Sequence, residues 1–239
     1  MLACMKKPVL ILQQLSIEPA ALLAEIVHDE GWETVPVLAK NEPVPVALDG
    51  YAGLIVMGGP MSANDVHLDF IAAELKLLKK AIAQDFPVLG ICLGSQLLAK
   101  AAGATIHAAA EHELGWYPLT PLASAADDPL FSDSADGLDV FQWHGETFSL
   151  PEEATLLASC ESVPHQAFRL GSCQYGLQFH IEVDEAIIRT WIDANDADRE
   201  HLGDEGVKRM LAETPARIDH AHTFCREMTK AWLGLLDTQ

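Results

Sequence analysis

The chain has 239 residues, 49% of them hydrophobic, which is enough to bury a large core. Its formal net charge is −20 at pH 7, and this excess of acid argues against nucleic acid as a partner, because binding phosphates depends on Lys and Arg. No stretch approaches the ~18 apolar residues that a membrane span needs, so we expect a soluble protein without a membrane partner.

Strands and helices alternate through the N-terminal part of the chain. This pattern predicts a doubly wound, mostly parallel α/β sheet of the flavodoxin-like kind, flanked by helices. The helix predicted at 68–84 is strongly amphipathic, with apolar residues on one side and lysines on another. In chain order, the expected elements are strand 9–13, helix 19–29, strand 33–38, strand 52–57, helix 68–84, strand 86–91 and helix 95–102.

The strand at 52–57 leads into the turn Gly58-Gly59-Pro60. Gly59 tolerates unusual backbone dihedrals, and Pro60 stops a helix or further strand pairing, so the turn can present a backbone N–H to solvent. Taken alone, the turn is also typical of an ordinary connection from a strand to a loop.

The strand at 86–91 leads into Gly90-Ile91-Cys92-Leu93-Gly94-Ser95-Gln96, which predicts a sharp turn that carries Cys92 between a strand and a helix. This is the Gly-x-nucleophile-x-Gly pattern, with Cys where hydrolases have Ser. The glycines allow the turn residue a strained backbone, and the N–H groups of the helix favour thiolate over thiol. The alternative is a small apolar Cys at the end of a strand.

The segment from residue 104 to 179 shows short strands and turns, which predicts a small antiparallel extension of the sheet. After it, residues 176–183 (Gly-Leu-Gln-Phe-His-Ile-Glu-Val) alternate between apolar and polar, which predicts a strand with His180 and Glu182 on one face. Glu182 can then hold the imidazole of His180 in one orientation. The expected strands of the extension are 114–121, 139–143, 155–159 and 166–170.

Residues from about 190 to 239 form a helical C-terminal extension of what we expect to be a single domain, 1–239. Helices are predicted at 184–193, 204–212 and 215–236, and residues 195–206 read as a loop, or as a helix entry capped by Asp204. Trp191, Phe224, Trp232 and Leu235 favour packing of these helices on the main domain over binding of a partner.

The three motifs, in this order and spacing, resemble the class I (triad-type) glutamine amidotransferase family, and within it the GMP synthetase branch as a free-standing domain. The resemblance covers most of residues 8 to 190. It implies that Cys92 is the nucleophile, His180 its base and Glu182 the acid that orients the base. It also implies that the backbone N–H groups of Gly59 and Leu93 form an oxyanion hole.

The segment 140–146 resembles the substrate-side loop of the family, although this chain has Trp-His-Gly-Glu where the GMP synthetase branch often has Ser-His-Gly-Asp. The chain also has Ile181 where many members have Pro. The resemblance implies that Gln96 contacts bound glutamine. The residues that we expect on the substrate side are Gln96, Gly58, Trp143, His144 and Gly145.

These motifs favour hydrolysis of the glutamine side-chain amide through a γ-glutamyl thioester, giving glutamate and ammonia. A separate synthetase subunit could accept the ammonia. The alternatives are a γ-glutamyl peptidase or hydrolase, a non-enzymatic or redox role for Cys92, and a regulatory subunit that stays idle until a partner docks.

No cofactor is expected, because the chain has neither a phosphate-binding loop nor a dinucleotide fingerprint. No metal site is expected either, because the histidines lack paired ligand spacing. The odd number of cysteines and their spacing do not indicate a disulfide framework, and a working thiolate prefers a reducing compartment, so we expect a cytoplasmic protein. The cysteines are Cys4, Cys92, Cys160, Cys173 and Cys225.

Overall fold

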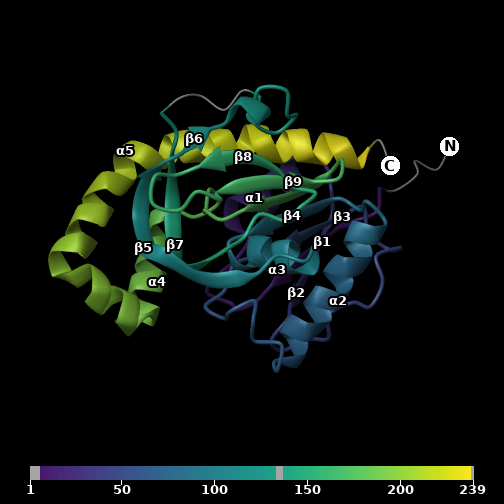
Figure 1. Ribbon diagram of the computed structural model, residues 1–239, viewed down its shortest axis with the longest axis horizontal. Coiled ribbons are helices and arrows are strands. Elements are labelled where there is room, and N and C mark those ends of the chain that lie inside the picture. The colour runs from purple at the N-terminus through teal and green to yellow at the C-terminus, as the bar shows by residue number, and fades with distance from the viewer. Residues whose placement is uncertain (1–5, 133–136, 238–239) are drawn as a thin grey trace.

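A computed structural model describes residues 6–132 and 137–237, and Cys4 lies outside these residues. Its centre is an eight-stranded sheet in the order β2-β1-β3-β4-β10-β9-β8-β6 (Figure 1). The pairs from β2 to β10 are parallel and those from β10 to β6 antiparallel, which confirms the predicted doubly wound sheet with an antiparallel extension. The strands are β1 (Val9–Gln13), β2 (Thr34–Leu38), β3 (Gly53–Val56), β4 (Val88–Ile91), β6 (Thr120–Pro121), β8 (Thr155–Ser159), β9 (Ala167–Leu170) and β10 (Gln174–Leu177).

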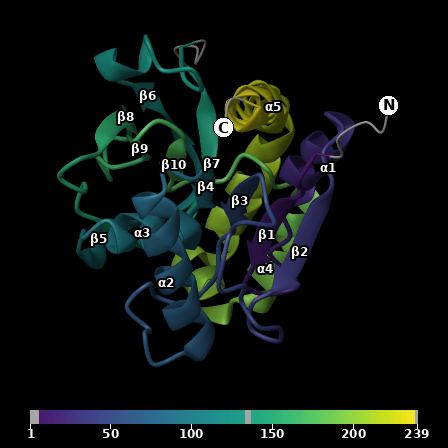
Figure 2. The ribbon, with the colours of Figure 1, turned by 90° about the vertical axis from the view of Figure 1, so that its right-hand side faces the viewer.

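Helices cover both faces of the sheet because its strands are apolar on both sides (Figure 2). On one face, Val9 and Ile11 of β1 lie in the same core as α1 (Ala21–Asp29) and the C-terminal part of α5 (Asp196–Leu236). On the other face, Leu10 and Leu12 share a core with two further helices. These are α2 (Asp69–Ala83) and α3 (Leu93–Ala101).

A second, two-stranded sheet pairs β5 (Ile106–Pro118) with β7 (Asp139–Phe148). Both strands are longer than predicted. The strand predicted at 114–121 is split between β5 and the short β6, which is followed by the 3₁₀ helix η1 (Ala123–Ala125). The register shifts between Ala108 and Glu113, and this bulge interrupts the alternation by which the N-terminal part of β5 could have been recognised.

The strand predicted at 176–183 is wrong beyond Leu177, where β10 ends. The chain then leaves the sheet, and His180 forms an isolated antiparallel bridge with Phe141 of β7. The His180 N–H donates to the Phe141 carbonyl at 2.8 Å, and the Phe141 N–H donates to the His180 carbonyl at 3.2 Å. His180 is therefore positioned by the second sheet.

The loop predicted at 195–206 is wrong, because helix resumes directly after α4 (Glu185–Ala194). The Asn195 side chain caps α5 by accepting the Asp198 N–H at 3.2 Å. Gly203, at φ +63° and ψ +167°, is not helical, so α5 consists of two helical stretches that meet at a kink there (Figure 1). The second stretch runs through Pro215, so the separate helices predicted at 204–212 and 215–236 are one helix that begins after Gly203.

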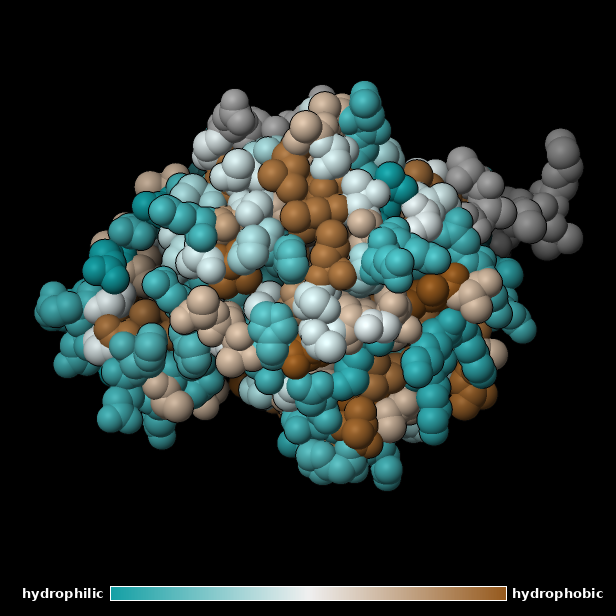
Figure 3. Space-filling view, in the orientation of Figure 1, coloured by the Kyte–Doolittle hydropathy of each residue, from teal (hydrophilic) through white to brown (hydrophobic). Residues whose placement is uncertain are grey.

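Hydrophilic side chains cover most of the face in Figure 3, with small hydrophobic areas between them. Among the described residues, the large hydrophobic side chains that stay exposed are those of Val46 and Val66. None of the helices described is both long and apolar enough to cross a membrane.

Candidate active site

Cys92 occupies the turn between β4 and α3, with φ at +50° and ψ at −109°. A positive φ is uncommon for a residue with a side chain, so this backbone is strained. The surroundings require glycine on both sides of the turn. A Cβ added at Gly90 would lie 2.6 Å from the Gly94 carbonyl oxygen, and one added at Gly94 would lie 2.0 Å from the Val56 carbonyl oxygen.

His180 and Glu182 form a buried pair beside this turn. The His180 Nδ1 lies 2.6 Å from Glu182 Oε1, and Glu182 Oε2 accepts the Ile181 N–H at 2.9 Å. A carboxylate only accepts, so Nδ1 carries a proton and Nε2 faces away from Glu182. The Trp191 ring packs edge-on against the imidazole, with the ring centres 4.8 Å apart.

Gly58 marks the point where the imidazole and Cys92 meet. A Cβ added there would lie 3.1 Å from His180 Cε1 and 3.4 Å from Cys92 Cβ. Burial by itself lowers the pKa of His180, but the Glu182 carboxylate and the hydrogen bond with Cys92 outweigh it and raise the pKa well above 6.5. These contacts favour the charged form of the imidazole next to the sulfur.

These groups open into a cavity of about 620 Å³. Of the residues predicted from the sequence, Glu182 contacts His180 away from this space and Gly58 borders both side chains. The others line the cavity, namely Cys92, His180, Gly59, Leu93, Gln96, Trp143, His144 and Gly145.

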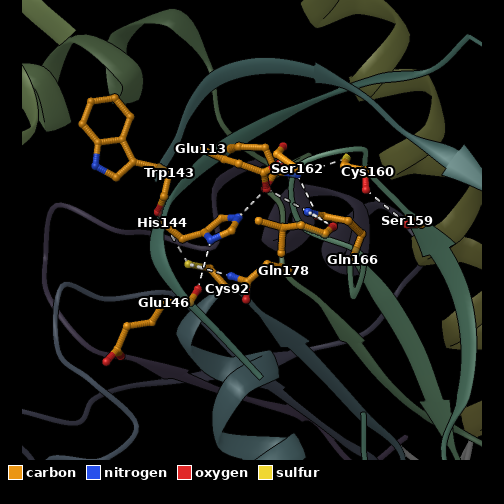
Figure 4. Close-up of polar contacts among 12 residues, drawn as sticks. Cys92, Glu113, Trp143, His144, Glu146, Ser159, Cys160, Ser162, Gln166 and Gln178 are labelled. Carbon is orange, nitrogen blue, oxygen red and sulfur yellow. Dashed lines mark hydrogen bonds and ion pairs between the residues drawn. The ribbon is translucent and has the colours of Figure 1, made fainter. Parts of the chain in front are cut away.

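The β7 segment that forms one wall is tied to Cys92 by polar contacts (Figure 4). The Cys92 thiol donates to the Trp143 carbonyl at 3.8 Å, and Gln178 Nε2 donates to the sulfur at the same distance. Gln96 Nε2 donates to the Glu146 carbonyl at 3.0 Å and to Gln178 Oε1 at 3.2 Å. The amide nitrogen of Gln96 is thus engaged within the protein.

His144 supports this wall from behind, because both of its ring nitrogens contact protein acceptors (Figure 4). Nε2 lies 2.9 Å from the Glu113 carboxylate, and Nδ1 lies 3.0 Å from the Glu146 carbonyl. Glu113 in turn accepts hydrogen bonds from Ser162 and from Gln166 Nε2. In this arrangement, His144 has no ring nitrogen left for a ligand.

Sequence reasoning missed Glu18, Glu113 and Gln178. Glu18 lines the cavity from the loop after β1, and its position at the carboxyl end of a parallel strand was the available signal. Glu113 contacts His144, which lies 31 residues away in the sequence, and Gln178 contacts Cys92, which lies 86 residues away. No local pattern in the sequence reveals such contacts.

The four cysteines described are buried, and of these only Cys92 lines the cavity. Burial raises the pKa of Cys160 to about 12 and that of Cys173 to about 11, and it raises the pKa of Cys225 further. Those three side chains therefore stay protonated at neutral pH. Within the described ranges, no group of three or more His, Cys, Asp or Glu is placed to hold a metal ion.

Comparison with known proteins places this chain in a family. Residues 25–189 match the sequence model described as glutamine amidotransferase class-I. The glutamine amidotransferase-like protein YfeJ of Salmonella typhimurium is 31% identical over 204 residues, which cover 82% of this chain and 83% of that protein. A glutamine-hydrolyzing GMP synthase of Porphyromonas gingivalis is 34% identical over 66% of this chain, but the match spans only 33% of the synthase.

Solved structures agree with these matches. A glutamine amidotransferase from Thermotoga maritima superposes with a TM-score of 0.85 at 30% identity, covering 95% of this chain and 97% of that one. One from Methylobacillus flagellatus gives a TM-score of 0.87 at 29% identity, covering 96% of this chain and 95% of that one.

Proposed function

The chain belongs to the class-I glutamine amidotransferase family, and on this basis we propose that it hydrolyses a γ-glutamyl amide, with glutamine as the simplest substrate, through Cys92, His180 and Glu182. The observation that carries the proposal is that Cys92 and His180 line one cavity while Glu182 holds the imidazole from outside it. The strained turn presents the sulfur, the imidazole borders the same Gly58, and Glu182 fixes the imidazole at 2.6 Å.

The turn at Cys92 acts as a nucleophile elbow. In the first half of the reaction, the Cys92 thiolate, paired with the His180 imidazolium, attacks the amide carbon, and the oxyanion is stabilised by the backbone N–H groups of Gly59 and Leu93, which both line the cavity. The C–N bond then breaks as the His180 imidazolium gives its proton to the departing nitrogen. This leaves a γ-glutamyl thioester on Cys92 and a neutral imidazole.

In the second half, His180 takes a proton from water as the water oxygen attacks the thioester carbon. The C–S bond breaks, releasing glutamate and restoring the sulfur and the charged imidazole. Glu182 holds the ring through both halves. The ammonia is either released or passed to a separate synthetase polypeptide, because the matched GMP synthases extend well beyond the part that this chain covers.

Substitution of the nucleophile tests this proposal. Cys92→Ala should abolish glutamate release from glutamine while leaving the circular dichroism spectrum and the melting temperature close to those of the wild type, since the sulfur contacts Trp143 and Gln178 only at 3.8 Å. Cys225→Ala is the matched control, because that thiol is buried away from the cavity. Glutamate release that persists in purified Cys92→Ala would refute the mechanism.

The compartment that suits this chemistry is the cytoplasm, since a cysteine nucleophile must stay reduced.

A further inference from the structure

Apart from histidines, the ionisable side chains that line the cavity are acidic, except for the Cys92 thiol. Among the described residues that line it, the acids are Glu18, Asp65, Glu146 and Asp198, and none is Lys or Arg. The indole rings of Trp143 and Trp191 also line the cavity. Tryptophan is the side chain whose ring face attracts cations best. Both the acidic residues and the indole rings of the lining therefore favour a positively charged ligand group.

Two of these acids are already engaged. Asp198 accepts hydrogen bonds from Trp143 Nε1 at 2.8 Å and from Asn195 Nδ2 at 2.5 Å, and Asp65 accepts the Ser62 N–H at 3.0 Å. The carboxylate of Glu18, in contrast, makes no hydrogen bond or ion pair with any residue of the described ranges. Glu18 is therefore free to bind a ligand.

Glu18 lies beside the reacting groups. A Cβ added at Gly58 would be 3.4 Å from Glu18 Oε2, 3.1 Å from His180 Cε1 and 3.4 Å from Cys92 Cβ. The carboxylate thus borders the same point as the imidazole that hands a proton to the departing nitrogen. A substituent on that nitrogen would therefore lie beside the Glu18 carboxylate, whereas the glutamyl part remains bonded to the sulfur.

We propose that this site prefers γ-glutamyl amides whose amine part carries a positive charge, and that Glu18 is the residue that selects them. The proposal rests on the hydrolysis proposed above and names its substrate class. The bond that breaks is the same C–N bond, so the products are glutamate and a free diamine or polyamine, with water as the only co-reactant.

The electrostatic state of Glu18 supports this assignment. Burial raises its pKa to about 7, against a smaller lowering by His180, while Glu182 adds to the increase. His180 only partly offsets this desolvation, and no hydrogen bond from a described residue supports the carboxylate, so Glu18 gains from a further cation that enters beside it.

The test compares amides of different charge at pH 8, with glutamate release as the readout. The substrates are glutamine, γ-glutamyl-1,3-diaminopropane, the uncharged γ-glutamyl-n-butylamide with the same number of non-hydrogen atoms, and the anionic γ-glutamyl-β-alanine. We expect kcat/KM for the diamine amide to exceed that for the butylamide by about tenfold or more, as for a hydrogen bond to a charged group. The β-alanine amide should be the poorest substrate.

In Glu18→Gln, the ratio of the diamine amide to the butylamide should fall towards one. Glu25→Gln, on the exposed side of α1, is the matched control and should keep the wild-type ratio. A butylamide cleaved as well as the diamine amide would overturn the proposal. So would an equal loss for all amides in Glu18→Gln, which would assign Glu18 to the glutamyl part. Failure of the wild type to cleave glutamine and every amide would overturn the proposed function itself.

Discussion

Glu182 and His180 have unequal roles in the proposed mechanism, because His180 transfers protons and Glu182 only holds it. The imidazole has further supports, since its backbone is bridged to Phe141 and its ring packs on Trp191. His180→Ala should lower kcat by roughly 10²–10⁴-fold, the usual contribution of a general acid–base. Glu182→Ala should cost less. Steady-state kinetics on folded variants would check this order, and a larger loss in Glu182→Ala would contradict the assigned roles.

The raised pKa of Glu18 gives a pH signature for charge selection. With a pKa of about 7, Glu18 becomes ionised as the pH rises from 6 to 8. The preference for the diamine amide over the butylamide should therefore grow over this range and stay flat in Glu18→Gln. Titration of His180 affects both substrates alike and cancels in the ratio of their kcat/KM values. A ratio in the wild type that does not change with pH would contradict the assignment.

A second buried carboxyl group with a raised pKa, that of Glu74, lies where the end of β1 contacts helix α2. Gln14 Nε2 donates to Glu74 Oε2 at 3.0 Å, while Oε1 of each residue lacks a hydrogen-bond partner. Burial raises the pKa of Glu74 to about 8, with the hydrogen bond from Gln14 opposing it. Because the folded pKa exceeds the ordinary 4.5, the folded state binds the proton more tightly, and stability is lost as the pH rises from about 4.5 to about 8.

Glu74→Gln removes this ionisation and keeps the shape of the side chain. Its melting temperature should exceed that of the wild type at pH 8.5, since each unit of raised pKa corresponds to about 1.4 kcal/mol. The difference should shrink towards zero near pH 5. Thermal unfolding at several pH values provides the check, and a difference that is the same at pH 5 and pH 8.5 would rule out a buried ionisation.

The elements that could be predicted from the sequence are those whose signals are local. The apolar strands β1, β3 and β4 and the glycine-flanked turn at Cys92 fall where expected, because each carries its own pattern of burial or turn chemistry. Other elements depend on distant partners. The segment 179–182 alternates like a strand, but His180 pairs with Phe141 of the other sheet. Glu18 comes close to Cys92 only because the ends of β1, β3 and β4 lie side by side in the sheet.

The C-terminal helix packs into the main core, which supports our proposal that residues 1–239 form a single domain. Phe224, Met228 and Trp232 of α5 share one core with β1 and α1. The fit is close, because a Cβ added at Gly53 of β3 would lie 2.9 Å from the Trp232 ring. Loosening α5 would therefore expose the core beneath it.

We expect thermal unfolding in one cooperative transition, with tryptophan fluorescence and far-ultraviolet circular dichroism giving the same midpoint. The fluorescence reports on several elements, because Trp116 lies in the second sheet, Trp191 in α4 and Trp232 in α5. Two separate transitions, one of them seen only in the helical circular dichroism signal, would contradict a single domain.

In the proposed mechanism, the sulfur of Cys92 bonds to the side-chain carbonyl carbon (Cδ) of a glutamyl group. The most direct measurement is peptide mapping by mass spectrometry after treatment with a glutamine analogue that carries a chloroketone in place of the amide. We expect one adduct, on Cys92, that forms in step with the loss of glutaminase activity and is slowed in His180→Ala. Inactivation with Cys92 unmodified, or labelling of Cys160, Cys173 or Cys225 instead, would contradict it.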